Sequence, residues 1–275
     1  MTARPSVRLI ASDLDGTLLD GDGRLSERTI AAVRAADESG VIVVAATGRS
    51  HRTAAPRLEP AEVIRTAVCS NGASVYDVAG RRIIGHRPIA EDVVPGLLVA
   101  LRSAHPDVCF GWETAEGFGW EHDFAHLAPV HVRDRLLDGT RADELHVSID
   151  DVGPRRLTKL LVGHPRIHSN DWLAEVSPLL AGVVQVSTSG AAFVEVTDDG
   201  VDKASTLASV CAGLGVDRSE VAAFGDQSND VAMLEWAGRS WAPANAHASA
   251  MAAADTVIGP HDDDAVAQVI EDLLG

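Results

Sequence analysis

The sequence predicts an α/β protein in which a parallel, doubly wound sheet is interrupted by a separate α+β insert. Short aliphatic runs alternate with helical stretches and turns over the first 85 residues, which is the pattern of such a sheet. The composition of the sequence then changes, and eight of the eleven histidines lie between His86 and His168. The first pattern resumes at Val201. We therefore expect a core at residues 1–87 and 195–275 and an α+β insert at residues 88–194.

Buried strands are expected where short apolar runs end at polar or turn residues. In the first part of the chain these runs are Val7 to Ala11, Val41 to Ala46 and Thr66 to Ser70. Ser26 can cap a helix that extends to Ser39, and Gly40 follows as the expected terminating glycine. Two further short strands, Ser74 to Asp77 and Arg81 to Gly85, predict a hairpin.

The insert is expected to contain both helices and short strands. The helical stretches are Ala90 to Ala104 and Ser169 to Leu180, and the strand candidates lie near Leu145 to Ile149, Thr158 to Val162 and Val183 to Ser187. Where the core resumes, a helix is expected from Asp202, because apolar residues recur at helical spacing up to Leu214. Cys211 lies on that apolar face and is expected to be a buried thiol. Val221 to Phe224 predicts another strand, and a helical pattern closes the chain.

The composition restricts the classes of function. The chain of 275 residues is 46% hydrophobic but only 4% aromatic, which predicts an aliphatic core. Its formal charge is −17, from 23 basic and 40 acidic residues, which argues against nucleic acid and anionic membranes as partners. Three cysteines make no disulfide framework, and neither a signal region nor a run of ~20 apolar residues occurs. We expect a reduced, cytoplasmic protein.

Polar side chains follow three of the predicted strands. Asp13 and Asp15 come after the first, Thr47 after the second and Asp226 after a later one. Alone, the two N-terminal acids could form a solvent-exposed turn with Gly16. In a parallel sheet, however, the ligand lies outside the carboxyl ends of the strands, so these side chains are expected to converge.

Lys203, at the start of a helix, and Asp230, four residues after Asp226, can join the same site. Carboxylates, an ammonium and a hydroxyl make an oxygen-rich site that suits Mg²⁺ and a substrate phosphate. One carboxylate can attack phosphorus, and a second can transfer the proton of the leaving oxygen. The hydroxyl and the ammonium can hold the oxygens of the transferring group. The alternative for Asp230 is a helix cap.

Four segments resemble, in order and spacing, the motifs of the haloacid dehalogenase superfamily. They are Asp13-Leu14-Asp15-Gly16-Thr17, Thr47-Gly48-Arg49, Lys203, and Gly225-Asp226-Gln227-Ser228-Asn229-Asp230. Ser70-Asn71-Gly72-Ala73, the position of the insert, and Asn245-Ala246 resemble the Cof-type branch, subfamily IIB. The resemblance implies a Rossmann-like core, an α+β cap domain of C2 type, and a phosphatase that works through an aspartyl-phosphate.

The resemblance also implies roles for individual residues. Asp13 is the expected nucleophile and Asp15 the general acid and base, and an acid at this second position favours hydrolysis. Substrate phosphate is expected to contact Thr47, Gly48, Arg49, Asn71, Lys203 and Asn229. The expected ligands of Mg²⁺ are the carboxylate of Asp13, the carboxylate of Asp226 and the main-chain carbonyl of Asp15. Asp230 is expected to contact these ligands and not the ion itself.

Three positions depart from the family pattern without removing a charged group: Gln227, Ala204 and the run Trp241-Ala242-Pro243-Ala244. The expected activity is hydrolysis of a small phosphorylated metabolite, with a sugar phosphate as the class that the resemblance favours. Two alternatives stay open: a phosphomutase that uses the same aspartate pair, and a metabolite-binding regulator without activity. Neither the physiological substrate nor the oligomeric state has a signature in the sequence.

Three histidines of the insert suggest a second possible metal site. His122, His126 and His131 lie close in sequence, but no cysteine accompanies them. A solvated or core role is therefore expected in preference to zinc binding.

Overall fold

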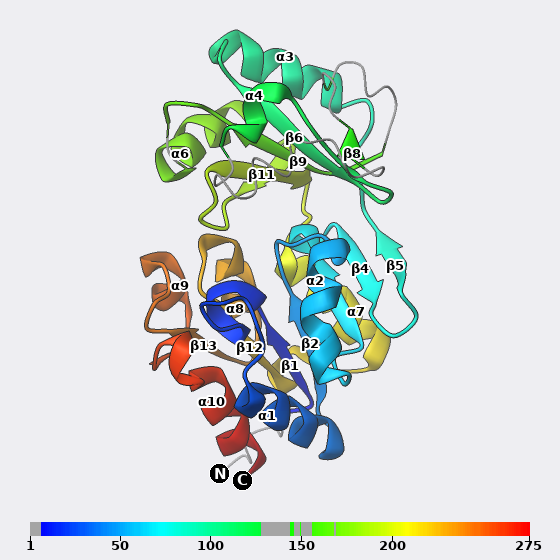
Figure 1. The fold of residues 1–275 in the computed structure, drawn as a ribbon, viewed down its shortest axis with the longest axis vertical. Helices are drawn as coiled ribbons and strands as arrows, with labels where there is room; N and C mark the ends of the chain where they lie inside the picture. The colour runs from blue at the N-terminus through cyan, green and yellow to red at the C-terminus, as the bar shows by residue number, and fades with distance from the viewer. Residues whose placement is uncertain (1–6, 128–143, 146–148, 150–155, 168) are drawn as a thin grey trace. The chain divides into compact units, whose positions relative to one another are not determined.

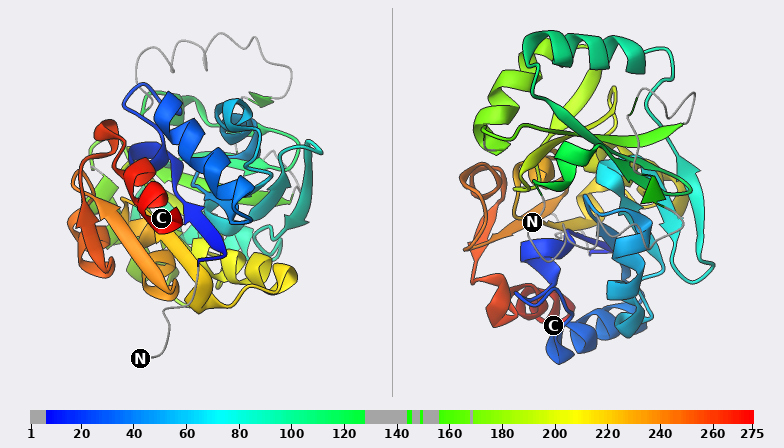
Figure 2. Two further views of the ribbon diagram at one scale, coloured as in Figure 1. Left: turned by 90° about the horizontal axis from the view of Figure 1, so that it is seen from below. Right: turned by 45° about the horizontal axis from the view of Figure 1, so that its top comes forward.

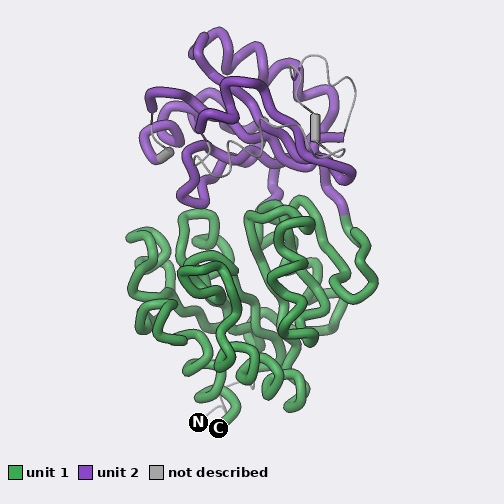
Figure 3. The backbone as a smooth tube through the Cα atoms, viewed as in Figure 1, with its two compact units in different colours: residues 1–85, 202–275 green, residues 86–201 purple. Residues whose placement is uncertain are grey.

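The computed structural model describes residues 7–127, 144–145, 149, 156–167 and 169–275, and the chain divides into two compact units (Figure 3). The core unit is Met1–Gly85 with Asp202–Gly275, and the insert unit is His86–Val201. Strand β11 (Phe193–Asp198) pairs with strands of the insert unit. The chain therefore returns from the insert unit to the core unit after this strand, and not at residue 194 as expected. The predicted α/β class is confirmed.

The core unit is built on an eight-stranded sheet of order β14-β13-β12-β1-β2-β3-β4-β5 (Figure 1). Its strands are β1 (Leu9–Ser12), β2 (Ile42–Ala46), β3 (Thr66–Cys69), β4 (Ser74–Asp77), β5 (Arg82–His86), β12 (Val221–Phe224), β13 (Arg239–Pro243) and β14 (Thr256–Ile258). The pairs from β14 through to β3 are parallel, whereas β4 is antiparallel to β3. The carboxyl ends of β12, β1, β2 and β3 therefore meet along one edge.

Helices cover both faces of this sheet, as expected for a doubly wound fold. One face packs on α1 (Glu27–Glu38), α2 (His51–Leu58) and α10 (Ala265–Leu274), and α1 and α10 lie side by side (Figures 1 and 2). The other face packs on α7 (Lys203–Leu214), α8 (Val231–Trp236) and α9 (Ala248–Ala253). Cys211 of α7 is buried in the second of these cores, as predicted.

The insert unit has a six-stranded sheet of order β10-β11-β9-β6-β7-β8. The strands not yet given are β6 (Cys109–Thr114), β7 (Phe118–Trp120), β8 (Glu144–Leu145), β9 (Leu157–Gly163) and β10 (Val184–Ser187). Most pairs are antiparallel, and only β7 and β8 run parallel. Helices α3 (Val94–Ala104) and α6 (Ser169–Leu180) pack on one core of this unit, while α4 (His122–Ala125) packs on a smaller one.

Local signals in the sequence set the helix ends. Ser26 accepts a hydrogen bond from the main-chain nitrogen of Thr29 at 3.0 Å and begins α1, and Gly40 follows that helix with φ +80°. Asp202 caps α7 by accepting from the main-chain nitrogen of Ser205 at 2.6 Å. The strand expected at Leu145 to Ile149 is seen only as β8, because residues 146–148 lie outside the described part. Within the described residues, no helix has the length and apolarity needed to span a bilayer.

Candidate active site

Four neighbouring parallel strands deliver the predicted polar residues to one edge of the core sheet. Asp13 follows β1, Thr47 follows β2, Asn71 lies just after β3, and Asp226 lies two residues after β12. The loops are also joined directly: the main-chain nitrogen of Asp13 donates to the carbonyl of Phe224 at 2.9 Å. Main-chain hydrogen bonds between neighbouring strands therefore fix the backbone positions of the residues that carry these side chains.

The loop after β1 turns sharply so that it can approach the loop after β12. The main-chain nitrogen of Leu19 donates to the carbonyl of Leu14 at 2.8 Å, and Gly16 has φ +74°. A Cβ atom on Gly16 would lie 2.5 Å from Oδ2 of Asp226. Glycine is needed here both for the backbone conformation and for the close approach of the Asp226 carboxylate.

Lys203 links two of the carboxylates. Its Nζ atom donates to Oδ1 of Asp13 and to Oδ1 of Asp230, each at 2.6 Å, and its side chain is 1% exposed. Burial by itself lowers the pKa of Lys203, but the two carboxylates more than offset this and raise it. The ammonium is therefore charged and can hold further anionic oxygens.

Three buried carboxylates gather around this ammonium. Asp13, Asp226 and Asp230 each offer an oxygen, and these oxygens lie within 4.8 Å of one another. Burial, followed by the charge of Asp230, raises the pKa of Asp226. Burial is also the main cause of the raised pKa of Asp13, and Lys203 partly counteracts it. With all groups ionised, the cluster carries two more negative than positive charges.

The donor set fits Mg²⁺. The oxygens are hard ligands, and a divalent cation would balance the excess charge of the cluster. Asn229 adds a buried Oδ1 acceptor that no donor of the described residues satisfies, so it is available to a hydrated ion or a ligand. Both oxygens of Asp230 already accept hydrogen bonds, from Lys203 and from the main-chain nitrogens of Asp226 and Gln227. Asp226 accepts two hydrogen bonds, one on each oxygen, and Asp13 accepts one from Lys203. Asp230, with three, is therefore the most fully hydrogen-bonded of the three carboxylates, which favours Asp13 and Asp226 as direct ligands and Asp230 as their support.

Two side chains around Asp226 were not assigned a role from the sequence. Thr17 Oγ1 donates to Oδ1 of Asp226 at 3.0 Å, and Gln227 Nε2 donates to Oδ2 at 3.0 Å. Thr17 belongs to the first motif, but only the folded chain shows which carboxylate it contacts. Gln227 departs from the family pattern, yet its amide orients the same carboxylate.

The loops after β2 and β3 form the other side of the site. Thr47 is buried, its Oγ1 accepts from the main-chain nitrogen of Arg49 at 3.1 Å, and its carbonyl accepts from the main-chain nitrogen of Asn71 at 3.1 Å. Ser70 and Asn71 have φ +51° and +56°, values that cost energy for residues other than glycine. Asn229 Nδ2 donates to Oδ1 of Asn71 at 3.0 Å, so this strained loop contacts the loop after β12.

Asp15 lies apart from the carboxylate cluster. Its two oxygens accept hydrogen bonds from Nε and Nη2 of Arg49, and its side chain is 49% exposed. Arg49, expected from the sequence to contact substrate phosphate, can therefore have a second role. Its guanidinium can orient Asp15, the predicted general acid and base. Gly48 stands between Thr47 and Arg49 in the same loop.

Comparisons with known proteins find similar sequences over nearly the whole chain. The family model of the haloacid dehalogenase-like hydrolases matches residues 10–270 of the chain. YcsE of Bacillus subtilis (strain 168), a 5-amino-6-(5-phospho-D-ribitylamino)uracil phosphatase, is 27% identical over 266 residues, which cover 96% of this chain and 94% of YcsE. YbhA of Escherichia coli (strain K12), a pyridoxal phosphate phosphatase, is 27% identical over 274 residues, covering 96% and 98% of the two chains.

The similarity extends to solved structures. A haloacid dehalogenase-like hydrolase from Bacteroides thetaiotaomicron aligns with a TM-score of 0.76 at 25% identity, covering 98% of this chain and all of the other. SMU.1108c from Streptococcus mutans aligns with a TM-score of 0.83 at 20% identity, covering 98% and 99%, which is a likeness of fold.

Proposed function

The chain belongs to the haloacid dehalogenase-like hydrolases, and we propose that it is a Mg²⁺-dependent phosphatase that hydrolyses a small phosphorylated metabolite through an aspartyl-phosphate on Asp13. The observation that carries the proposal is the buried contact of Lys203 with Asp13 and Asp230 beside Asp226. A regulator without activity has no need of such a costly concentration of buried charge.

The first step is attack by Asp13 on phosphorus. Lys203 donates to Oδ1 of this carboxylate, so we assign the attack to Oδ2. The bond from Oδ2 to phosphorus forms while the bond from phosphorus to the substrate oxygen breaks, and Asp15 gives a proton to that oxygen. Bound Mg²⁺ would offset the repulsion between the attacking carboxylate and the phosphoryl oxygens.

The second step regenerates the carboxylate. Asp15, now ionised, takes a proton from water as the water oxygen bonds to phosphorus, and the bond from phosphorus to Asp13 breaks. Lys203 and the Thr47 hydroxyl hold phosphoryl oxygens in both steps. Arg49 orients Asp15 through the two contacts that the guanidinium makes with its oxygens. Asn71, Gly48 and Asn229 are proposed to contact the substrate around the phosphate.

The substrate is proposed to be a small organic phosphate monoester. The two relatives named above act on a phosphorylated ribityl compound and on pyridoxal phosphate, so family membership alone admits different organic groups. A sugar phosphate is the class we propose first. The insert unit, as the cap of this family, would select among these compounds.

The test is turnover of p-nitrophenyl phosphate, followed by a panel of sugar, alditol and pyridoxal phosphates, with Mg²⁺ and with EDTA. We expect turnover that depends on Mg²⁺ and requires Asp13. Repeating the reaction in ¹⁸O-labelled water separates a phosphatase from a phosphomutase. Label in the released phosphate supports hydrolysis, and transfer to a second hydroxyl without label would establish the mutase instead.

A further inference from the structure

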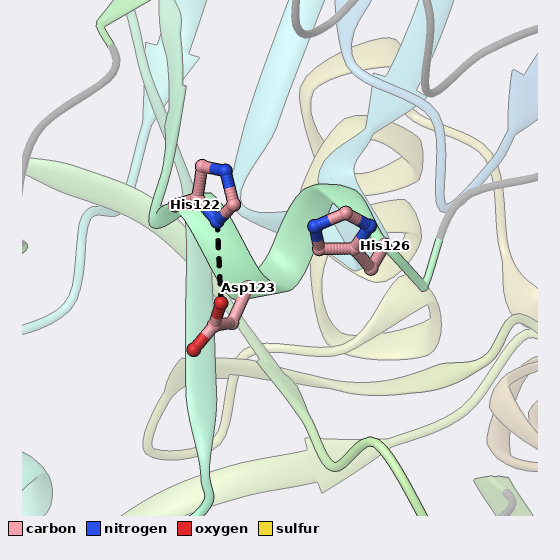
Figure 4. Close-up of side chains that lie close together, drawn as sticks. All are labelled: His122, Asp123 and His126. Carbon is pink, nitrogen blue, oxygen red and sulfur yellow. Dashed lines mark hydrogen bonds and ion pairs between the residues drawn. The ribbon is translucent and has the colours of Figure 1, made fainter.

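A second group of side chains with donor atoms for a metal ion lies on the insert unit, on the short helix α4 and at the residue that follows it (Figure 4). We propose that His122, Asp123 and His126 form a binding site for a transition-metal ion of the zinc class. This site is distinct from the carboxylate cluster of the core unit and does not depend on the proposed phosphatase activity.

The three side chains are close enough to share one ion. One donor atom from each, a ring nitrogen or a carboxylate oxygen, lies within 4.8 Å of the others. Nδ1 of His122 is 3.2 Å from Oδ1 of Asp123, and the two imidazole rings have centroids 5.1 Å apart at 66°. Figure 4 shows the two rings and the carboxylate around the same helical turn, and all three side chains are exposed. Histidines at positions i and i+4 face the same side of a helical turn, as in known zinc motifs.

The helix turn that carries these ligands is firmly held. Its other face is buried: Phe124 and Ala125 are 3% and 0% exposed and belong to the small core of the insert unit. The Glu121 carboxylate, just before α4, accepts hydrogen bonds from Nη2 of Arg102 at 2.8 Å and from the main-chain nitrogen of Phe110 at 3.1 Å. A backbone fixed in this way limits the entropy lost when the side chains close on an ion.

Ligand chemistry separates the two sites. Imidazole nitrogen suits Zn²⁺, Cu²⁺ and Ni²⁺, whereas Mg²⁺ prefers oxygen ligands. Two nitrogens, one carboxylate oxygen and one solvent position give the four-coordinate arrangement that Zn²⁺ adopts. The sequence alone favours a solvated or core role for these histidines, because no cysteine accompanies them. The folded chain supplies Asp123 as a third ligand, while His131 lies outside the described residues.

The experiment is calorimetric titration of the full chain with Zn²⁺ in excess Mg²⁺. We expect the wild-type protein to bind one more equivalent of Zn²⁺ than the double variant His122→Ala/His126→Ala. Asp123→Asn should bind Zn²⁺ more weakly. All three side chains are exposed, so the melting temperatures of these variants without zinc should equal that of the wild type.

Two controls make the result specific. His247→Ala removes an exposed histidine of the core unit and should leave the additional equivalent in place. Asp226→Asn weakens the carboxylate cluster and should also leave it, which separates this proposal from the phosphatase proposal. The proposal is overturned if the double variant binds as many equivalents as the wild type, or if the additional equivalent is lost in Asp226→Asn.

Discussion

At the scale of single residues, the core site concentrates charge that the fold does not need. Asp13 and Asp230 share the Lys203 ammonium, and Asp226 adds a third buried carboxylate. The raised pKa of Asp13, caused chiefly by burial, and the raised pKa of Asp226 both reflect the cost of ionising this cluster without a cation. Such a cost is expected where function, and not stability, determines the residues.

Asp13→Asn should therefore abolish turnover while stabilising the metal-free protein. We expect kcat to fall by at least about a thousandfold, because an amide cannot form the acyl-phosphate. In EDTA near neutral pH the free energy of unfolding should rise by about 0.5–2 kcal/mol, because one of the buried negative charges is gone. Steady-state kinetics and thermal unfolding check this. A destabilised Asp13→Asn protein would mean that the carboxylate is structural.

Thr17→Val tests whether the contacts around Asp226 tune metal binding. Valine keeps the shape of threonine but cannot donate to Oδ1 of Asp226. We expect the Mg²⁺ concentration for half-maximal activity to rise by about 10–100-fold, with activity restored at high Mg²⁺. Thr256→Val, on the exposed strand β14, is the matched control and should behave as the wild type. An unchanged Mg²⁺ dependence in Thr17→Val contradicts the assignment.

The charged residues of the core site could be predicted from the sequence, but most of their hydrogen-bond partners could not. Asp13, Asp226 and Lys203 follow from strand ends, a helix start and motif spacing, and the structure brings them together. The contacts of Thr17 and Gln227 could not be predicted, because a threonine or glutamine in a loop has many possible acceptors. The pairing of Arg49 with Asp15 likewise depends on where two flexible side chains come to lie.

At the scale of elements, the loop after β3 and the start of α7 position Lys203. Gly72 has φ +100°, and a Cβ atom there would lie 2.1 Å from the carbonyl oxygen of Asp202. The carbonyl of Gly72 accepts from Oγ1 of Thr206 at 2.8 Å. The first turn of α7 thus packs against this loop, and Lys203 belongs to that turn.

Gly72→Ala should displace the first turn of α7. The methyl group cannot fit against Asp202, and alanine disfavours the backbone conformation. We expect kcat/KM to fall by roughly 10–100-fold, because a shift of about 1 Å at a catalytic group is enough for that loss. Gly213→Ala, an exposed position in the same helix with no atom near the added Cβ, should keep full activity and gain up to about 1 kcal/mol of stability. Equal kinetics in both variants would contradict this role for the loop.

Elements with local signals were predicted well, and those without them were missed. The core strands β1, β2, β3 and β12 are short aliphatic runs, and α1 and α7 have capping residues, so their positions followed from the sequence. Strand β6 reads Cys-Phe-Gly-Trp-Glu-Thr and is buried at every position. Its glycine and glutamate hide the apolar pattern, because Glu113 is paired with Lys159 only in the folded sheet.

At the scale of the whole molecule, two units with separate hydrophobic cores share one chain. The apolar clusters of the core unit lie on the two faces of its sheet, and the clusters of the insert unit contain none of the same residues. The Mg²⁺ site that we propose belongs to the core unit alone. Ligand binding therefore stabilises that unit directly.

Mg²⁺ should raise the melting temperature of the core unit in a manner that depends on pH. The folded-state pKa values of Asp13 and Asp226 lie above their unfolded values, so protons stabilise the metal-free fold. Its free energy of unfolding therefore falls as the pH rises from the unfolded pKa values of these two groups to their folded ones. Protons compete with Mg²⁺, so the stabilisation by Mg²⁺ should be greatest near neutral pH, about 2.7 kcal/mol at a hundredfold excess over Kd, and shrink as pH falls. Calorimetry of the wild type and of Asp226→Asn, which should lose the effect, checks this. An effect that grows towards low pH contradicts it.

We expect Asp13 to carry the phosphoryl group during turnover, and trapping the phospho-enzyme identifies the residue that does so. Asp15→Asn removes both the proposed proton donor of the first step and the proton acceptor of the second. p-Nitrophenyl phosphate has a leaving group that departs without a proton, so the phospho-enzyme should accumulate when this variant is mixed with that substrate and Mg²⁺ and quenched in acid. Peptide mass spectrometry should then locate one phosphoryl group on Asp13, and the double variant Asp13→Asn/Asp15→Asn should carry none. A phosphoryl group on another residue, or turnover of Asp15→Asn that continues without any trapped phospho-enzyme, would contradict the account.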